Sequence, residues 1–270
     1  MPKPKHKFER INIDVTEAQI EEFAERYISL RSHIREYQNL ENNPIFKDSG
    51  FSTEGIRKII ESYTVPIRHS TLPYRDIYRS DFGELLLTLF FDEEFDSLGE
   101  SFIIPIKNIW DREHNDMPGR GIDVTGYKTV DGKIEVLIGE AKVSEQKTSP
   151  PKVSEEIYQE QKKYASPNSE YLKRRLSNYS KKLPPEHSAH LTLVIFAIDT
   201  GGMDNIYEIV FGCCLVRDTE CFKDTDYGKI KSNQNEFNSH RVHFIIPVFD
   251  KPIKETVDLF YRKIQEKVNG

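Results

Sequence analysis

The chain has 270 residues, of which 37% are hydrophobic and 30% are charged, and it carries a net charge of −6 with a mean hydropathy of −0.60. This length suits one domain with an elaboration, or two small domains. The acidic balance argues against a nonspecific nucleic-acid coat, but not against a local basic surface. No segment approaches the roughly 20 apolar residues of a membrane span, and no apolar signal-peptide core follows the basic N-terminus. We therefore expect a cytoplasmic protein with no membrane partner.

The cysteine content is too low for a disulfide framework or a zinc site. The three cysteines, Cys213, Cys214 and Cys221, make an odd count, and the first two lie in an apolar stretch. We expect buried thiols, as a reducing compartment permits.

The N-terminal third is predicted to be helical. Apolar residues recur at helical spacing over 16–40, at Ile20, Phe23, Tyr27, Leu30 and Ile34. A second helix is expected over 53–63 with Ile56, Ile59 and Ile60 facing inward, and 39–44 is expected to be a loop. We expect residues 1–75 to form an N-terminal helical region that caps the main domain, residues 76–270, or docks a partner. The two parts are expected to form one compact unit.

A third helix is predicted over 79–91, where Ser80 or Asp81 can cap its N-terminus. Its apolar stripe consists of Phe82, Leu85, Leu86, Leu89 and Phe90. Glu84 lies on or next to this buried face, where it can act in a site or simply favour the helix dipole. A strand is expected over 102–106, followed by a polar loop over 111–120. His114 in that loop could approach a reacting group, but a lone loop histidine is more often ordinary.

The most informative feature is a predicted hairpin with two acids and an amine. One strand begins with Gly-Ile-Asp-Val at 121–124, the other ends with Gly-Glu-Ala-Lys at 139–142, and 131–133 reads as the tight turn. Side chains two apart share a face of a strand, so Glu140 and Lys142 point the same way. The hairpin can place Asp123 beside them, which gives two carboxylates for a divalent cation and one adjacent ammonium.

Composition alone produces similar triplets elsewhere, such as Glu145-Gln-Lys147 and Glu160-Gln-Lys162. The copy at 140–142 differs because it continues the apolar run 136–138, and a strand that enters a core does not carry two charges without a reason. The competing interpretation is a surface strand with a glutamate and a lysine on its wet face.

Two helices are predicted after the hairpin, over 153–165 and 168–182. The segment 162–182 has a single acid and seven basic residues, which are Lys162, Lys163, Lys173, Arg174, Arg175, Lys181 and Lys182. Tyr164, Tyr171 and Tyr179 are interleaved among them. This basic strip could bind a phosphate backbone, with tyrosines available for stacking, or could be a solvated helix face.

The C-terminal third is predicted to alternate strands and a helix. The apolar run Leu191–Ile198 has strand length and predicts a central strand buried on both faces. Further strands are expected over 206–216 and 242–249, with a loop-rich segment at 217–240. Pro252 is expected to open a last helix.

The predicted order of elements, α-β-β-β-α-β, resembles the core of the PD-(D/E)xK nuclease superfamily, a restriction-endonuclease-like α/β fold with a mixed sheet flanked by helices. Three segments look like the HamA family, the nuclease subunits of the Hachiman anti-phage defence system. They are Arg-Ser-Asp-Phe-Gly-Glu-Leu-Leu-Leu at 79–87, Gly-Ile-Asp-Val-Thr-Gly-Tyr at 121–127 and Gly-Glu-Ala-Lys at 139–142. The superfamily resemblance covers roughly residues 79–198.

This resemblance implies a set of roles. Asp123 and Glu140 would hold Mg²⁺ or Mn²⁺, with the Ala141 carbonyl as a third ligand. Lys142 would orient or activate the attacking water, and Glu84 would match a helix-borne acid near the metal. DNA would be the substrate, and a HamB-like helicase would be the partner. The proline that usually precedes the first acid of the superfamily is absent here. One nuclease branch also carries a helix motif, Gln-x-x-x-Tyr, which this sequence does not match, because Gln161 stands three rather than four residues before Tyr164. Gln161 therefore receives no catalytic role.

Two alternatives to a defence nuclease with a helicase partner remain open. One is a site-specific restriction endonuclease that acts alone, which would cut DNA into discrete fragments. The other is a docking or regulatory module that cuts nothing. The pair of acids disfavours the second alternative, because like charges close together are costly unless a cation is present.

Overall fold

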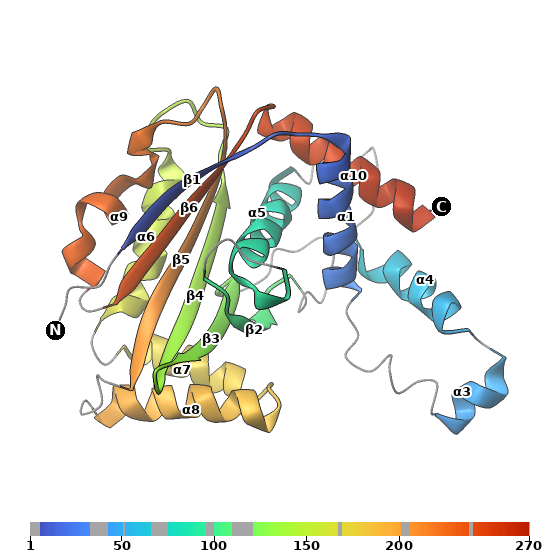
Figure 1. Ribbon diagram of the computed structural model, residues 1–270, viewed down its shortest axis with the longest axis horizontal. Helices are drawn as coiled ribbons and strands as arrows, with labels where there is room; N and C mark the ends of the chain where they lie inside the picture. Colours follow the sequence, from blue (N-terminus) through green and yellow to red (C-terminus); the bar gives the residue numbers. More distant parts are fainter. Residues whose placement is uncertain are drawn as a thin grey trace.

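The computed structural model describes residues 6–32, 43–50, 52–65, 75–95, 100–109, 121–166, 169–200, 206–237 and 240–269. These residues form a six-stranded mixed sheet with the order β1-β6-β5-β4-β3-β2 (Figure 1). The strands are β1 (Lys7–Ile13), β2 (Ile103–Lys107), β3 (Val124–Val130), β4 (Lys133–Val143), β5 (Tyr207–Asp218) and β6 (Arg241–Phe249). Strands β2, β3 and β4 are antiparallel neighbours, whereas β4–β5, β5–β6 and β1–β6 are parallel.

Helices cover both faces of the sheet (Figure 1). One core includes residues of α1 (Glu17–Arg31), α5 (Arg75–Phe91) and α10 (Ile253–Asn269), and α4 (Thr53–Thr64) packs beside them. The second core includes residues of α6 (Lys152–Ala165), α7 (Glu170–Ser180), α8 (Pro185–Thr200) and α9 (Gly228–Ser232). Short elements complete the described chain: α3 (Pro44–Ser49), η1 (Glu93–Phe95), η2 (Asp224–Tyr227) and η3 (Gln234–Phe237). The arrangement is an α/β fold with a mixed sheet flanked by helices, as the sequence predicts.

The β3–β4 hairpin forms where the sequence predicts it. Asp131 and Gly132 adopt φ of 50° and 75°, the left-handed pair that a tight hairpin turn requires. Beyond the turn, Val136, Leu137 and Ile138 are buried against alternating sides of the sheet, as expected of a strand covered on both faces. The hairpin thereby brings the beginning of β3 beside the end of β4.

The predicted strand Leu191–Ile198 is wrong, because this segment is the second half of helix α8. Leu191, Val194 and Ile198 are buried at helical spacing, whereas Leu193 and Phe196 are 54% and 57% exposed. A continuous apolar run of eight residues fits a buried strand and a helix equally well, so periodicity could not separate them. The strand parallel to β4 is β5, and the α-β-β-β-α-β order holds with this replacement.

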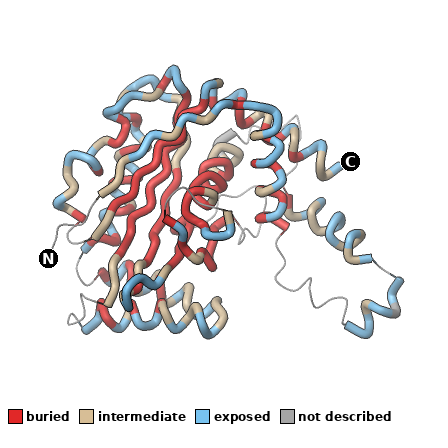
Figure 2. Tube along the Cα trace, in the orientation of Figure 1, coloured by how far each residue is buried: buried red, intermediate tan, exposed pale blue. Residues whose placement is uncertain are grey.

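Other differences concern the N-terminal half. Helix α5 begins at Arg75, so Ser80 and Asp81 lie inside it rather than capping it. Its middle is buried nearly all round, because it lies between the sheet and the α1 and α10 layer (Figure 2). No side chain of α4 is buried, and Ile59 is 57% exposed, so the prediction that Ile56, Ile59 and Ile60 face inward is wrong.

Strand β1 was not predicted, and it pairs with β6 at one edge of the sheet, so residues 1–75 are not purely helical. The predicted apolar face of α1 is buried at Ile20, Phe23, Tyr27 and Leu30. Ile34, and the loop 111–120 with His114, lie outside the described residues. The division at residue 75 stays a prediction. Among the described helices, none has the length and apolar character needed to span a membrane.

Candidate active site

Three charged side chains meet at the open end of the β3–β4 hairpin. The backbone amide of Ala141 donates a hydrogen bond of 2.7 Å to Asp123 Oδ2, which ties this carboxylate to β4. Lys142 Nζ donates a hydrogen bond of 2.7 Å to Glu140 Oε1, and both side chains lie on the face of β4 that α6 covers. The sequence therefore located this cluster, while the roles of its members stay predictions.

Burial and the proximity of Asp123 disfavour the ionised form of Glu140 in this cluster. Glu140 is 8% exposed and Asp123 is 9% exposed. Burial, and after it the nearby Asp123 carboxylate, raise the pKa of Glu140 to about 8, although Lys142 partly offsets this. Burial lowers the pKa of Lys142, but the Glu140 carboxylate outweighs it, so the pKa of Lys142 is raised overall. A buried acid pair of this kind favours a cation beside it.

Glu84 lies on the other side of β4. It is 3% exposed, and Ser80 Oγ donates a hydrogen bond of 3.2 Å to its Oε1. Gly83 allows this close approach of α5, because a Cβ there would come within 2.9 Å of Val143 Cγ2. Within the described ranges, no three acidic, histidine or cysteine side chains gather closely enough to hold a metal ion. Glu84 is therefore not grouped with Asp123 and Glu140 as a third side-chain ligand.

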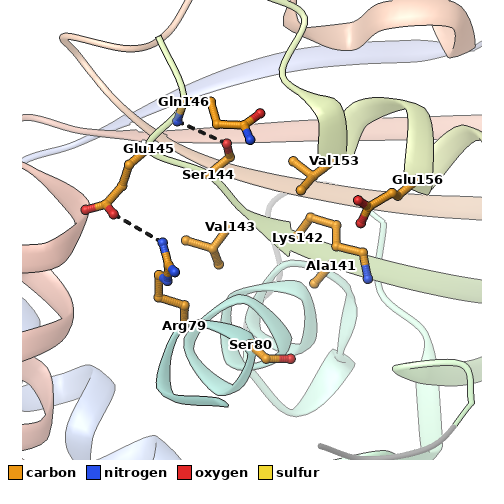
Figure 3. A pocket seen from close by; sticks show the side chains of 10 residues that line it. All are labelled: Arg79, Ser80, Ala141, Lys142, Val143, Ser144, Glu145, Gln146, Val153 and Glu156. Carbon is orange, nitrogen blue, oxygen red and sulfur yellow. Dashed lines mark hydrogen bonds and ion pairs between the residues drawn. The ribbon is translucent and has the colours of Figure 1, made fainter. Parts of the chain in front are cut away.

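A cavity of about 680 Å³ opens at the end of β4. Its wall follows residues 141–146, with Arg79 and Ser80 of α5 and Val153 and Glu156 of α6 completing it. Figure 3 shows Arg79 reaching toward Glu145, with which it forms an ion pair of 3.1 Å, whereas Lys142 lies on the side of Glu156. The amine of the motif thus reaches a space large enough for a substrate group. Sequence reasoning assigned no functional role to Arg79 or Glu145.

Sequence reasoning also missed Arg217, which holds the cavity wall in place. This side chain is fully buried and pairs with Asp226 at 2.8 Å. It also donates to the carbonyl oxygens of Ser144 and Gln146, both at 2.7 Å. The segment that follows β4 is thereby fixed to β5. An arginine at the end of the apolar run 209–216 was the available signal, because a charge buried there requires partners.

The basic strip is largely neutralised within the chain. Lys162 pairs with Glu236, Lys163 with Glu160, and Lys173 with both Glu170 and Asp199. Arg174 and Lys181 are exposed and Arg175 is half-buried, whereas Lys182 is exposed and engaged in a contact. The strip is therefore not a uniform cationic surface.

Gln161, to which the sequence assigned no catalytic role, is buried and donates from Nε2 to the Ile138 carbonyl at 3.3 Å. This contact joins α6 to β4 two residues before Glu140. It supports a packing role for the side chain.

The fold and the site define an α/β protein with a mixed sheet between two helical layers and an acid–acid–lysine cluster at the end of the β3–β4 hairpin. The family model HamA matches residues 7–264, so nearly the whole chain is covered. The chain belongs to the HamA family, and it is a protein associated with Hachiman anti-phage defence. No curated protein and no solved structure matches it.

Proposed function

We propose that this protein is a metal-dependent DNA nuclease, the effector subunit of a two-component anti-phage defence system with a helicase partner. The observation that carries the proposal is the cluster of Asp123, Glu140 and Lys142. Asp123 and Glu140 are both buried, and the pKa of Glu140 is raised. Such a pair contributes no more to folding stability than apolar residues would, so a catalytic role explains its position better.

The donor set fits a hard divalent cation. Asp123 and Glu140 would supply carboxylate oxygens and Ala141 a backbone carbonyl, and such oxygen ligands suit Mg²⁺ or Mn²⁺. A cation bound there would lower the pKa of a coordinated water and neutralise charge on the scissile phosphate. Asp123 is already oriented by the Ala141 amide, which reduces the ordering that ion binding would require.

Lys142 is suited to electrostatic stabilisation. Its contact with Glu140 raises its pKa, so the ammonium stays protonated at neutral pH and does not serve as the base in this state. It lines the cavity and can donate hydrogen bonds to the phosphate oxygens or to the attacking water. Glu140 therefore both orients the ammonium and contributes to the acid pair. Glu84 would act behind β4, by supporting α5 against the motif strand.

The partner and the biology follow from the family. The sequence contains no Gly-x-x-x-x-Gly-Lys-Ser/Thr phosphate loop, so a motor would be supplied by another protein. A helicase partner would hold the nuclease in check and release it on phage-altered or damaged DNA. The exposed members of the basic strip would contact either DNA or this partner.

The test is cleavage of linear and supercoiled DNA by the purified chain with Mg²⁺, Mn²⁺ or EDTA. Cleavage should require the metal and should be lost in Glu140→Ala and in Lys142→Ala while both variants stay folded. Near-wild-type cleavage by either folded variant would overturn the assignment. Discrete fragments instead of a smear would favour a stand-alone restriction endonuclease.

A further inference from the structure

One face of helix α7 combines aromatic rings and a cation beside the candidate active site. Tyr171, Arg175 and Tyr179 are spaced four residues apart and so lie along one side of the helix. Tyr164 of α6 adjoins this face, with its ring centroid 5.2 Å from that of Tyr171. We call these four residues the tyrosine–arginine face. Three other cations of the basic strip, Lys162, Lys163 and Lys173, instead pair with carboxylates.

This face contacts the segment that leads into Asp123. Gly121 has a φ of 118°, and a Cβ built on it would come within 2.8 Å of Arg175 Nη1 and 3.2 Å of Tyr179 Oη. The guanidinium therefore packs directly against the Gly121 backbone. Because consecutive Cα atoms are about 3.8 Å apart, the Cα atoms of Gly121 and Asp123 are separated by at most about 7.6 Å. Arg175 Nη1 therefore lies within about 12 Å of the Asp123 Cα atom, a distance that a short stretch of a nucleic-acid strand spans.

A second observation places the two sites together. Tyr164 lies on α6, and α6 packs on the face of β4 that carries Glu140 and Lys142. One helix therefore contributes to the tyrosine–arginine face and also covers the strand of the acid–lysine motif. Lys163 forms an ion pair with Glu160, which moderates its repulsion of a phosphate.

The chemistry of the face is specific. Arg175 has no carboxylate partner among the described residues, and its guanidinium lies 5.5 Å from the Tyr171 ring and donates to Tyr171 Oη at 3.4 Å. Tyr171 is 42% exposed, so a flat π-surface is available next to an unneutralised cation. Nucleic-acid strands are bound by this combination, since bases stack on aromatic rings and phosphates pair with arginine. In a duplex the base faces are covered, so stacking requires an unpaired base.

We infer that Tyr171 and Arg175 form a binding site for a single-stranded DNA segment, with a base stacked on Tyr171 and its phosphate on Arg175. The inference rests on the proposed nuclease function and adds to it a substrate class, single-stranded or frayed DNA. The strand would run along α6 and α7 toward the acid pair. The competing role for this face, docking of a partner protein, predicts no change in DNA affinity when the face is altered.

The test is fluorescence anisotropy with the full chain in EDTA, where no metal-dependent cleavage takes place. The probes are a labelled single strand of about 15 nucleotides and a blunt duplex of the same length. Tyr171→Ala should weaken single-strand binding roughly 5- to 150-fold, which corresponds to about 1–3 kcal/mol per stacked base. Tyr171→Phe keeps the ring and should bind within about twofold of wild type. Tyr63→Ala removes a tyrosine that is 77% exposed on α4 and should change nothing.

Salt dependence tests Arg175 separately. Each phosphate contact contributes about 0.7 to the slope of log K against log salt for single strands, so Arg175→Ala should make the slope shallower by about 0.7. Arg262→Ala removes the same charge from an exposed site on α10 and should leave the slope unchanged. Thermal unfolding of each variant confirms that it is folded.

Three outcomes would overturn the inference. They are a wild-type chain that does not bind the single strand more tightly than the duplex, a Tyr171→Ala variant within twofold of wild type, and equal losses in the control variants. Failure of the nuclease proposal is distinguishable, because it concerns cleavage with metal, whereas these measurements concern binding without it.

Discussion

Replacing Glu140 by glutamine should stabilise the metal-free protein, and increasingly so as the pH rises. In the folded chain the Glu140 carboxyl has a pKa of about 8, because it is buried and lies next to Asp123. In the unfolded chain it titrates at about 4.3. A raised acid pKa means that stability is fully present below the unfolded value and is lost as the pH rises toward the folded value.

The size of the effect follows from this window. Each unit of pKa difference is worth about 1.4 kcal/mol, so moving from pH 5 to pH 8 should cost the wild type on the order of 2–4 kcal/mol at this one group. Glutamine keeps the shape and cannot ionise, so Glu140→Gln should lie within about 1 kcal/mol of the wild type at pH 5 and clearly exceed its stability at pH 8.

The assay is urea unfolding in EDTA at pH 5 and at pH 8, with the free energy of unfolding compared between wild type and Glu140→Gln. Glu220→Gln is the matched control, because Glu220 is exposed on the turn after β5. It should be indistinguishable from wild type at both pH values. A difference between wild type and Glu140→Gln that does not change with pH, or a wild type that is the more stable at pH 8, would refute the reasoning.

Three further predictions concern the same site. Mg²⁺ should displace the Glu140 proton, so below about pH 8 the apparent affinity for Mg²⁺ should rise with pH and binding should release protons. Calorimetry in two buffers with different ionisation enthalpies measures this proton release. An equal heat of binding in both buffers would contradict the prediction. Lys142→Met should reduce the cleavage rate by roughly 10²–10³-fold, as measured by single-turnover kinetics, while calorimetry should show unchanged Mg²⁺ binding. Loss of cleavage together with loss of Mg²⁺ binding would mean that the lysine acts through the metal site instead. Arg217→Met should leave the buried Asp226 without its cationic partner and lower the free energy of unfolding in urea by about 3–5 kcal/mol. The double variant with Asp226→Asn should recover part of this loss. A single variant with unchanged stability would contradict the proposed anchoring of the cavity wall.

The hairpin and its charged cluster were predictable because local signals agree there. Asp131 and Gly132 fix the turn, the turn fixes the register, and the register places Asp123 beside the end of β4. Strand alternation then decides that Glu140 and Lys142 share a face. Each of these steps depends on residues close in sequence, which is why they could be derived without a structure.

Other features depend on tertiary context, which the sequence does not display. The run Leu191–Ile198 satisfies both a buried strand and a helix, and packing against the sheet and against α7 decides for the helix. Helix α4 has the spacing of an amphipathic helix, yet Ile59 and Tyr63 are exposed. Strand β1 is too polar to be recognised alone, and its pairing with the distant β6 defines it. Arg217 needs the carbonyl groups of residues 144 and 146, which only the folded chain brings to it.

The most direct test of the proposed function follows an end-labelled linear DNA incubated with the purified chain in Mg²⁺, in Mg²⁺ with excess EDTA, and with the Glu140→Gln variant in Mg²⁺. A metal-dependent nuclease centred on Asp123, Glu140 and Lys142 predicts loss of the full-length DNA in the first sample alone. Calorimetric titration of the wild type with Mg²⁺ accompanies the assay. It detects the metal site even if the protein does not cleave DNA in the absence of its partner. DNA that stays intact in all three samples, together with no Mg²⁺ binding, would contradict the account and favour a docking module.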